Sequence, residues 1–576
     1  MSANWVTIPL TEQQELEARQ LSESLGLSLV VSRLLVRRGV NTPELAEDYL
    51  QPRLANQPDP YLMMGMEQSV ACLRYHLRSR RPIMITGDHD VDGVTSVALV
   101  HNVLRDLFGC AGRLHYHIPN EKDEGYGISR NCIDWAKALG CELIISVDTG
   151  IKALESVEYA RREGLDVIIC DHHQPDEVLP RATAILNPKQ PGCSYPNAQL
   201  SACGVCYKLM QALAQSEGIA LTKLYNYLDL LAVSTAADLV PLIGENRAYV
   251  VHGLHQLSSH PSIGMRALLS QVRIHPGDKI DTSTIIYKIA PRLNAAGRMQ
   301  NGQLAVDLLT ASSPEVAERA CTRLEAYNDE RRSHDSRMTA EAEELIASIE
   351  DLSEEPMLLL YRPDWHVGVM GIVAARMAER YRRPTIVMTR VGDEILASAR
   401  SFSPYNIYEA IESCRDLLKN FGGHKYAAGL TTEERHLPEL RRRLRDYMQR
   451  GEVKQQERSE VSVDALLAIE DITPRLVEEI RLMAPFGLKN ERPVFVTERM
   501  RDAGGSKVVG RDGQHLRLRM TDRYCRYKPI SGMALRQSNQ ARWVLSQQAF
   551  GVRYTFDDQR AEQGGVQLCV HEIYTH

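Results

Sequence analysis

Four clusters of acidic and histidine residues carry the side chains in this sequence that could do chemistry together. The clusters are Asp88, His89, Asp90 and Asp92; Asp148; Asp171, His172 and His173; and Asp238. Carboxylates crowded into one place raise one another's pKa unless a cation neutralises them. Aspartates with neutral imidazoles form a ligand set that suits Mn²⁺ or Mg²⁺ better than zinc. Two such ions bridged by a carboxylate are a common device for hydrolysing phosphate esters, because they activate water and steady phosphoryl charge.

Each cluster taken alone has a simpler explanation. The DxDxDG segment at 88–93 could be a calcium loop or a solvated turn, although the Glu that ends an EF-hand loop is missing. Asp148 and the Asp171 triplet could each cap a helix. The first three clusters, however, each follow a short apolar run, and the carboxyl ends of parallel strands meet in one crevice. Their joint placement therefore indicates an active site.

The apolar runs before these clusters alternate with amphipathic helices, which predicts a parallel α/β sheet. The expected strands lie within 81–88, 141–150 and 165–173, with helices over 94–108 and 155–164, and the pattern continues to about residue 245. The charged stretch from 313 to about 349 is nearly free of Gly and Pro, which predicts a long exposed helix joining two domains. A second α/β region follows, and alternating residues near the C-terminus predict a small β-domain.

These patterns divide the chain into five expected segments. They are an N-terminal helical arm (1–65), a parallel-sheet catalytic domain (66–310), a connecting helix (311–350), a second, smaller α/β domain (351–450) and an OB-fold-like β-domain (451–576). Within the arm, Thr42 and Pro43 form a helix start, with Thr42 as the N-cap. We expect the arm to be a packing or docking element.

The composition is that of an ordinary globular chain: 576 residues, 44% hydrophobic and 25% charged. The net charge of −6 excludes nothing, because nucleic-acid binding depends on where Lys and Arg cluster. The sequence has no apolar run of the roughly 18 residues that a membrane span needs, and no secretory signal. We therefore expect a cytoplasmic protein whose 12 cysteines are reduced thiols. The CxxC pair Cys203 and Cys206 has no partner pair, so we expect it to pack.

Four segments resemble, in order, the signature motifs of the DHH phosphoesterase superfamily: GDHDVDG at 87–93, VDTG at 147–150, DHH at 171–173 and STAADLVP at 234–241. YKIAPRLNAAGRM at 287–299 looks like the stretch that RecJ-type exonucleases carry after those motifs. GVMGIVAARMAERY at 368–381, ASARS at 397–401 and FGGHKYAAGL at 421–430 look like the DHH-associated domain. The resemblance spans roughly residues 30 to 500. It implies a two-metal, Mn²⁺- or Mg²⁺-dependent exonuclease that degrades single-stranded DNA from the 5′ end to mononucleotides in repair and recombination.

The resemblance also assigns roles to residues. Its metal ligands are Asp90, Asp92, Asp148, His172 and Asp238. Asp148 matches the bridging carboxylate and is expected to be catalytic. Asp88 falls within the signature and is expected to ligate or orient. His173 matches the imidazole that contacts the scissile phosphate or protonates the leaving oxygen, and Asp171 is expected to orient its neighbours.

The family's DNA contacts carry over to two regions. Arg292 and Arg298 match basic positions near the active site, and Gly297 between them would let the backbone approach closely. Surface ion pairs are the alternative for these arginines. The expected pocket for a terminal phosphate consists of Arg400, Ser401, Gly422, Gly423 and His424, with the last three in a Gly-rich turn. The C-terminal β-domain interleaves basic and aromatic residues between 507 and 528, which suggests a single-strand surface.

Two positions depart from the family, and three rival functions remain. His89 stands where the family usually has an aromatic residue, and we expect it to pack; Glu121 stands where relatives often have a basic residue. The rivals are a phosphodiesterase of short RNA or cyclic dinucleotides, a non-catalytic replication scaffold and a manganese pyrophosphatase. The expected partners are single-stranded DNA, a single-strand-binding protein and a helicase, with the protein itself a monomer.

Overall fold

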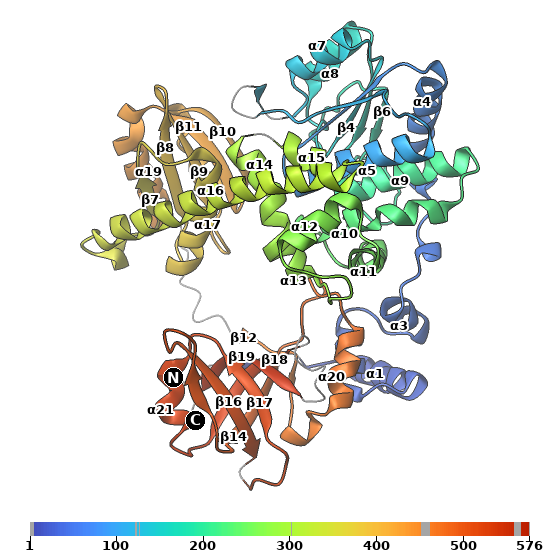
Figure 1. Ribbon diagram of the computed structural model, residues 1–576. Helices are drawn as coiled ribbons and strands as arrows, with labels where there is room; N and C mark the ends of the chain where they lie inside the picture. Colours follow the sequence, from blue (N-terminus) through green and yellow to red (C-terminus); the bar gives the residue numbers. More distant parts are fainter. Residues whose placement is uncertain are drawn as a thin grey trace.

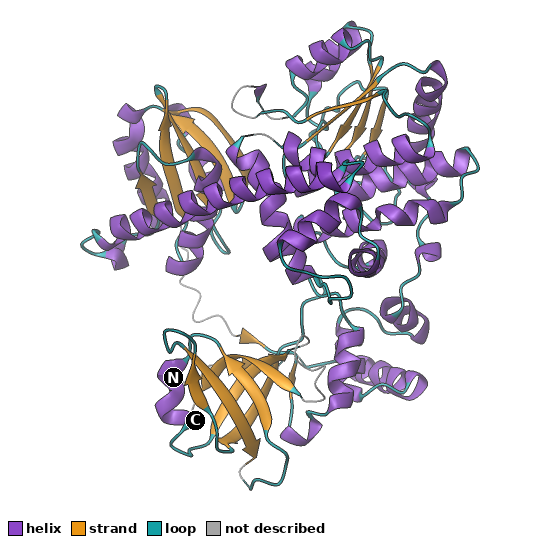
Figure 2. Cartoon of the chain, viewed as in Figure 1, coloured by secondary structure: helices purple, strands orange, loops and turns teal. Residues whose placement is uncertain are grey.

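The computed structural model describes residues 5–7, 9–120, 124–125, 127–300, 302–450, 461–522, 524–557 and 566–574. Glu121 therefore lies outside the described residues, as does the segment 451–460. Figure 1 shows two sheets joined by one long helix, with a barrel beneath them. The part of the chain that we expect to be catalytic, residues 66–310, is the catalytic part. Figure 2 shows that helices cover its sheet, whereas the barrel consists mostly of strands.

The catalytic part is built on a five-stranded sheet in which every neighbouring pair is parallel, in the order β3-β2-β4-β5-β6. The strands are β2 (Ile83–Gly87), β3 (Leu114–His117), β4 (Leu143–Val147), β5 (Asp166–Cys170) and β6 (Ala184–Leu186). The first strand, β2, lies between the second and the third. The chain adds β3 on one side of β2 and then β4 on the other side, so the direction in which strands are added reverses at β2.

Alternate residues of these strands enter two different cores, as the period of two in a strand requires. On one face Met84 and Ile144 pack under α7 (Arg130–Ala138) and α8 (Leu154–Arg162). On the other face Ile85 and Ile145 join the large core with the remaining helices. Those helices are α4 (Met66–Ser79), α5 (Val91–Leu107), α9 (Ala202–Ser216), α10 (Leu228–Ala237), α11 (Gly244–Ser259), α12 (Ile263–Gln271), α13 (Thr282–Thr284), α14 (Ala290–Met299) and α15 (Gln303–Leu309).

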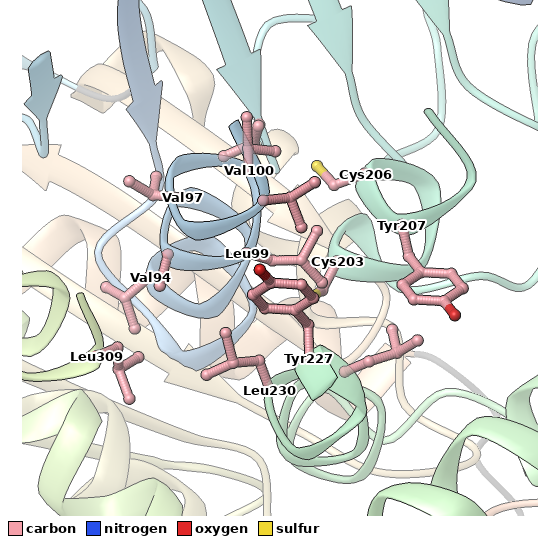
Figure 3. Close-up of a cluster of buried hydrophobic side chains, with 14 of the residues drawn as sticks. Val94, Val97, Leu99, Val100, Cys203, Cys206, Tyr207, Tyr227, Leu230 and Leu309 are labelled. Carbon is pink, nitrogen blue, oxygen red and sulfur yellow. The ribbon is translucent and has the colours of Figure 1, made fainter. Parts of the chain in front are cut away.

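Helix α5 runs through the large core, and every residue from Val91 to Val100 is buried. Leu99 of α5 lies beside Cys203 of α9 and above Leu230 of α10, whereas Val94 and Val97 lie on the other side of α5, where Val94 approaches Leu309 (Figure 3). Cys203 and Cys206 lie in this core, both fully buried. They belong to no group of metal-ligating residues in the described part of the chain. The expectation that the CxxC pair packs therefore agrees with its position.

The predicted long helix is α16 (Pro314–Ala347), with Ser313 as its N-cap. It leads to a second sheet in the order β10-β11-β9-β8-β7. The strands are β7 (Leu358–Tyr361), β8 (Thr385–Val391), β9 (Glu394–Arg400), β10 (Leu418–His424) and β11 (Ala427–Thr432), and the helices are α17 (Val367–Tyr381), α18 (Ile407–Glu412) and α19 (Leu437–Arg450). Gly422, Gly423 and His424 were expected in a turn. They lie in β10 instead, and the turn follows at 425–426.

The C-terminal part is a small closed barrel, because β14 pairs with both β18 and β16. Its strands are β13 (Ala465–Leu466), β14 (Phe495–Asp502), β15 (Lys507–Val509), β16 (His515–Asp522), β17 (Ile530–Ala534), β18 (Phe550–Phe556) and β19 (Gln567–Tyr574), with helices α20 (Pro474–Leu482) and α21 (Ala541–Val544). A five-stranded barrel of β14, β16, β17, β18 and β19 is the architecture of an OB-fold.

The N-terminal helices belong to the same body as this barrel. The helices α1 (Glu12–Leu25), α2 (Leu29–Arg37) and α3 (Pro43–Leu50) share one hydrophobic core with α20 and the barrel strands. The strand β1 (Trp5–Val6) also pairs with β12 (Val461–Ser462). Thr42 caps α3 with Pro43 in its first turn, as predicted. Among the described residues, the helices are all too short or too polar to cross a lipid bilayer.

Candidate active site

The four clusters meet at the carboxyl edge of the parallel sheet. Residues 88–92 follow β2, Asp148 follows β4 and the Asp171 triplet follows β5 directly, while Asp238 is the C-cap of α10. The edge between β2 and β4 is also where the strand order reverses. Open α/β sheets bind their ligands at such a switch point, because the loops of the two flanking strands diverge there and leave a crevice.

Asp92 is held by three donors and lies almost wholly buried, 2% exposed. The backbone N–H of Ala202 donates to its Oδ2 at 2.8 Å, and the N–H of Cys203 donates to Oδ1 at 3.0 Å. The Ser234 hydroxyl donates to the same Oδ1 at 2.7 Å. Ala202 and Cys203 open helix α9, whose N-cap is Ser201. The carboxylate therefore faces the N-terminus of a helix, where negative charge is stabilised.

Asp148 lies at the centre of the site and is also buried. Its backbone has a φ of +58°, a left-handed conformation that is uncommon outside glycine and collects at functional sites. Its N–H donates to the carbonyl of Cys170 at 2.9 Å, which anchors the turn to β5. The Oδ1 atom is buried, has no hydrogen-bond partner, and lies 3.3 Å from Nε2 of His172. This oxygen fits a cation, since an unpaired buried carboxylate oxygen is otherwise costly.

His172 presents Nε2 to Asp92 and Asp148, while its Nδ1 lies 3.7 Å from Asp238 Oδ2. Its Nδ1 lies 3.1 Å from the carbonyl of Leu200, and an imidazole donates a proton to such an oxygen. Nε2 is then the unprotonated nitrogen, and it lies 3.7 Å from Asp92 Oδ2. Burial lowers the pKa of His172 despite the nearby Asp92. A neutral imidazole oriented by a backbone carbonyl is the form that binds metal ions.

His173 forms a different pair, with Asp171. Nδ1 of His173 lies 2.7 Å from Asp171 Oδ1. Asp171 also accepts hydrogen bonds from the backbone N–H groups of His172, His173 and Ile151. Burial opposes the charge on His173, but the hydrogen bond and the field of Asp171 outweigh it and raise the pKa of His173. The predicted orienting role of Asp171 agrees with these contacts.

The remaining carboxylates repel one another strongly. Burial, with the charges of Asp92 and Asp90, raises the pKa of Asp238 to about 8. Burial, with the charges of Asp88 and Asp92, raises the pKa of Asp90 to about 6. The pKa of Asp148 is raised well above its ordinary value by burial and the same neighbours. Such a cluster is stable in its ionised form when cations neutralise it.

This cluster contains two groups of potential ligand residues, and within each group the ligand atoms all lie within 4.8 Å of one another. One group is Asp148, His172 and His173, and the other is Asp92, His172 and Asp238. Carboxylate oxygens with neutral imidazole suit Mn²⁺ and, with fewer nitrogens, Mg²⁺. The donor set thus fits divalent ions, and His172 belongs to both groups. Asp90 and Asp88 lie beside these groups in the first cluster, where Asp90 Oδ1 caps α5 by accepting from the Gly93 N–H at 3.1 Å.

The segment LNAAGR at 293–298 packs against the loop that carries the first aspartate cluster. Asn294 accepts a hydrogen bond from the Val91 N–H at 3.0 Å. Gly297 packs directly on His89, where a Cβ atom would lie 2.4 Å from the ring. Gly297 therefore allows a close approach, as predicted, and the group that approaches it is His89 of the same chain. His89 lies 2.9 Å from Asp88 through Nδ1 and belongs to neither group of ligand atoms.

A cavity of about 870 Å³ adjoins the aspartate cluster and separates the catalytic part from the second sheet. His89, Gly297 and Arg298 line it on one side, and Arg400, Gly422 and Gly423 line it on the other. Burial lowers the pKa of Arg400, which donates to the Ser398 hydroxyl and to the Ala399 carbonyl. Among the described residues no carboxylate is paired with Arg400. The cavity thus presents a buried cation that an anionic ligand could neutralise.

Three predicted DNA contacts do not line this cavity. Arg292 pairs with Glu325 of α16 at 2.6 Å, so it ties α14 to the connecting helix. Ser401 donates its backbone N–H to the Tyr426 carbonyl beside the cavity. His424 is exposed at the end of β10. For Arg292, the alternative of an ordinary ion pair describes the contact that the structure shows.

Sequence reasoning missed several supporting residues. Ser234 stands within the fourth signature, four residues before Asp238, and that spacing of one helical turn was an available signal. Asn294 lies inside a segment that we had singled out for its arginines and for Gly297. Lys189 lies near Asp238 and Asp171, whose charges partly offset the lowering of its pKa by burial. Nothing in the local pattern around Lys189 indicates that position.

Models of three domain families match the chain. The model described as the N-terminal domain of the DHH family matches residues 82–235, and that of the DHHA1 domain matches 354–450. The model of the RecJ OB domain matches residues 463–571. The matches therefore cover the parallel sheet, the second sheet and the barrel in turn.

Two curated relatives and one solved structure are similar over most of the chain. Single-stranded-DNA-specific exonuclease RecJ of Dickeya dadantii (strain 3937) is 36% identical over 487 residues, which cover 82% of this chain and 83% of the relative. The protein of that name from Bacillus subtilis (strain 168) is 36% identical over 486 residues, and the chain spans 60% of its length. The crystal structure of RecJ in complex with Mn²⁺ from Thermus thermophilus matches with a TM-score of 0.82 at 26% identity, covering 100% of this chain and 80% of that one.

Proposed function

The chain belongs to the RecJ family of single-stranded-DNA-specific exonucleases, and we propose that it hydrolyses single-stranded DNA from the 5′ end to mononucleotides in repair and recombination. The observation that carries this proposal is the buried cluster of carboxylates and imidazoles beside a cavity with a buried arginine. A phosphodiester needs both parts, since its charge must be held while water attacks the phosphorus. The relatives are named single-stranded-DNA-specific exonucleases, and we take the substrate class from them.

The residues proposed to hold two divalent ions are Asp90, Asp92, Asp148, His172 and Asp238. Support comes from the unpaired buried oxygen of Asp148 and from the raised pKa values of Asp90 and Asp238. Bound Mn²⁺ or Mg²⁺ would supply activation of water and neutralisation of charge on the phosphoryl oxygens. By its match to the family motif, Asp148 would serve both ions, and its buried Oδ1, which has no hydrogen-bond partner, is available to bind a cation.

The proposed proton donor is His173. Its Nδ1 is engaged by Asp171, so the proton available to a leaving oxygen is the one on Nε2. The raised pKa of His173 favours the protonated form of the ring, which is the form that can donate this proton. Asp171 holds the ring in this orientation through a network of backbone donors. Asp88, which lies 2.9 Å from His89, is proposed to orient the first cluster.

The proposed end-recognition uses the far wall of the cavity. Arg400 with Gly422 and Gly423 would bind a terminal 5′-phosphate, and Arg298 would contact the next phosphates. A phosphate pocket at a fixed distance from the metal ligands places the first phosphodiester bond at the reacting centre. This arrangement would make the enzyme work from the 5′ end.

The barrel is proposed to hold the strand further from the end. Lys507 on β15 pairs in register with Arg517 on β16, and Arg519 follows two residues later on the same exposed face. Tyr524 is 68% exposed and lies 5.0 Å from the Arg526 guanidinium. Exposed cations and aromatic rings on an OB-fold bind phosphates and stack on bases.

The test is digestion of 5′-labelled and 3′-labelled single-stranded oligonucleotides with added Mn²⁺. We expect labelled mononucleotide from the 5′ label at once and a descending ladder from the 3′ label, while a duplex resists. Asp148→Asn should be inactive. The matched control is Asp176→Asn, because Asp176 lies on the same loop as His173 but is exposed and paired with Lys152; it should keep full activity.

Other outcomes identify the rival functions. Cleavage of dinucleotides with long strands left intact would indicate a small-substrate phosphodiesterase, and binding without cleavage would indicate a scaffold. We place the activity in the cytoplasm, with the cell's DNA. An enzyme that needs a free single strand depends on partners that expose one, so we propose a helicase and a single-strand-binding protein, with this protein acting as a monomer.

A further inference from the structure

One buried arginine, Arg247 of α11, contacts both the N-terminal helices and the segment that leads into the C-terminal barrel. The residue is only 2% exposed. Its Nε donates to the Tyr49 carbonyl at 2.7 Å, and the guanidinium lies 4.0 Å from the centre of the Tyr49 ring. The two Nη atoms donate to a row of backbone carbonyls in the junction segment, which we define as residues 482–491. These are the carbonyls of Leu482, Met483, Ala484 and Pro485, at 3.5, 3.1, 2.8 and 3.4 Å.

The acceptors explain why a cation is buried there. Helix α20 ends at Leu482, and the last carbonyls of a helix lack partners within it and carry partial negative charge. Arg247 caps this end with a full charge and a planar array of donors. Among the described residues no carboxylate is paired with Arg247, so the helix end and the neighbouring carbonyls are its counter-charge.

Arg247 joins three parts of the chain that are distant in sequence. It belongs to the catalytic part through α11, Tyr49 belongs to the N-terminal helices, and the junction segment leads into the barrel. Other contacts surround it: the Leu242 N–H donates to the Leu488 carbonyl at 2.8 Å, and the Thr282 hydroxyl donates to the Phe486 carbonyl at 2.6 Å. Figure 1 shows α20 beside α1, at the point where the barrel meets the catalytic part.

The helix that carries Arg247 also packs on α10, the helix that ends at the proposed metal ligand Asp238. Helix α11 begins at Gly244, six residues after Asp238, and packs tightly on α10. At Gly253 a Cβ atom would lie 2.3 Å from the Leu228 carbonyl of α10, so the backbones of the two helices are in close contact there. Asp238 caps the other end of α10. A short and rigid path therefore connects Asp238 to the helix that holds Arg247.

We propose that Arg247 is a positioning residue that fixes the barrel and the N-terminal helices in one orientation relative to the metal ligands. This inference rests on the proposed function, because its consequence is the alignment of a single strand from barrel to active site. A strand long enough to reach both sites gains most from the second site when their separation is fixed, because the effective concentration of that site is then highest. A strand that reaches only the cavity and the metal ligands gains nothing from the barrel.

The test compares Arg247→Met with the wild-type chain on two substrates. Met keeps an unbranched, flexible side chain about as long as the stem of arginine, but it removes the charge and all the donors. On strands of about 40 nucleotides, which exceed the site size of an OB-fold, we expect KM to rise about tenfold or more. On strands of about 6 nucleotides, kcat and KM should both stay within about twofold. Arg266→Met is the matched control, since Arg266 is exposed on the neighbouring helix α12, and it should change neither value.

A second measurement reports the orientation directly. Small-angle X-ray scattering of Arg247→Met should show a larger radius of gyration, and limited proteolysis should cut faster within the junction segment. If Arg247→Met does not fold, Arg247→Lys, which keeps the charge but has a smaller array of donors, should show the same length-dependent rise in KM. An unchanged KM for long strands, or an equal loss on both lengths, would overturn the proposal. If the wild-type chain degrades neither strand, the proposed exonuclease function fails, whereas the scattering still tests the positioning role.

Discussion

Replacing Ser234 by alanine should weaken metal binding without touching a candidate ligand. The Ser234 hydroxyl makes the shortest of the three hydrogen bonds to Asp92, at 2.7 Å, and it also lies 2.7 Å from the Ser201 hydroxyl. The substitution leaves Oδ1 of Asp92 with the Cys203 N–H alone. Ser234 itself is wholly buried.

The magnitude follows from the charge on the acceptor. A hydrogen bond to a charged group contributes about 1.5–3 kcal/mol, and about 1.4 kcal/mol corresponds to a factor of ten in an equilibrium constant. Loss of a supporting contact to a metal ligand typically costs about 10- to 100-fold in affinity. We therefore expect Ser234→Ala to raise the Mn²⁺ concentration for half-maximal activity by about 10- to 100-fold, with kcat at saturating Mn²⁺ nearly unchanged.

The assay is a Mn²⁺ titration of the initial rate on a single-stranded oligonucleotide, with thermal stabilisation by Mn²⁺ as an independent readout. Thr235→Val is the matched control, because Thr235 is the next buried hydroxyl of α10 and donates to the Leu231 carbonyl of its own helix. Ser234→Thr keeps the hydroxyl and should retain most of the affinity. Equal Mn²⁺ requirements for Ser234→Ala, Thr235→Val and the wild-type chain would refute the reasoning.

Three further predictions follow from the same geometry. Asp148→Asn should abolish activity and yet raise the melting temperature of the metal-free protein at neutral pH, because it removes a buried carboxylate that its neighbours repel; a lower melting temperature would contradict this. In the metal-free protein, the raised pKa of Asp238 (about 8) means that the folded state binds the proton more tightly than the unfolded state. Stability from this group is therefore complete below the unfolded pKa of about 4 and is lost as the pH rises through about 8. The fall in melting temperature from about pH 6 to pH 9 should be smaller in Asp238→Asn, and added Mn²⁺ should reduce it in the wild-type chain. Gly368→Ala should destabilise the protein by about 1–3 kcal/mol in urea titrations, because the new Cβ would lie 2.2 Å from the Arg298 carbonyl, whereas Gly429→Ala, with 3.7 Å to its nearest neighbour, should be nearly neutral.

The local pattern of the sequence was sufficient for much of the fold. Strands β2, β4 and β5 each form one short apolar run, and both sheet faces are covered, so their residues read as continuous hydrophobic stretches. The helix α16 was predictable because Ser313 and Pro314 mark its start and no helix-breaking residue follows until its end. Such features depend on neighbours in the chain, which is the information that a sequence displays directly.

The pattern was less informative where strands pair over short distances. Gly422 and Gly423 suggested a turn, because glycine favours turns, yet both lie in β10 against β11. Gly423 tolerates its φ of +138° there because it has no side chain, and a Cβ atom would lie 2.4 Å from the Ala427 carbonyl. The glycine was therefore a signal for close packing, and composition alone did not separate that signal from a turn.

The sequence by itself determined which side chains could bind metal ions and that all of them except Asp238 follow parallel strands. Their order along the chain was enough, because strand ends in a parallel sheet must converge. Only the tertiary structure decided how each is held: the contact of Ser234 with Asp92, the left-handed backbone of Asp148 and the cap that Arg247 places on α20. It also decided that the N-terminal helices share a core with the barrel. These contacts join residues that are far apart in the chain, and their geometry depends on packing that no local spacing encodes.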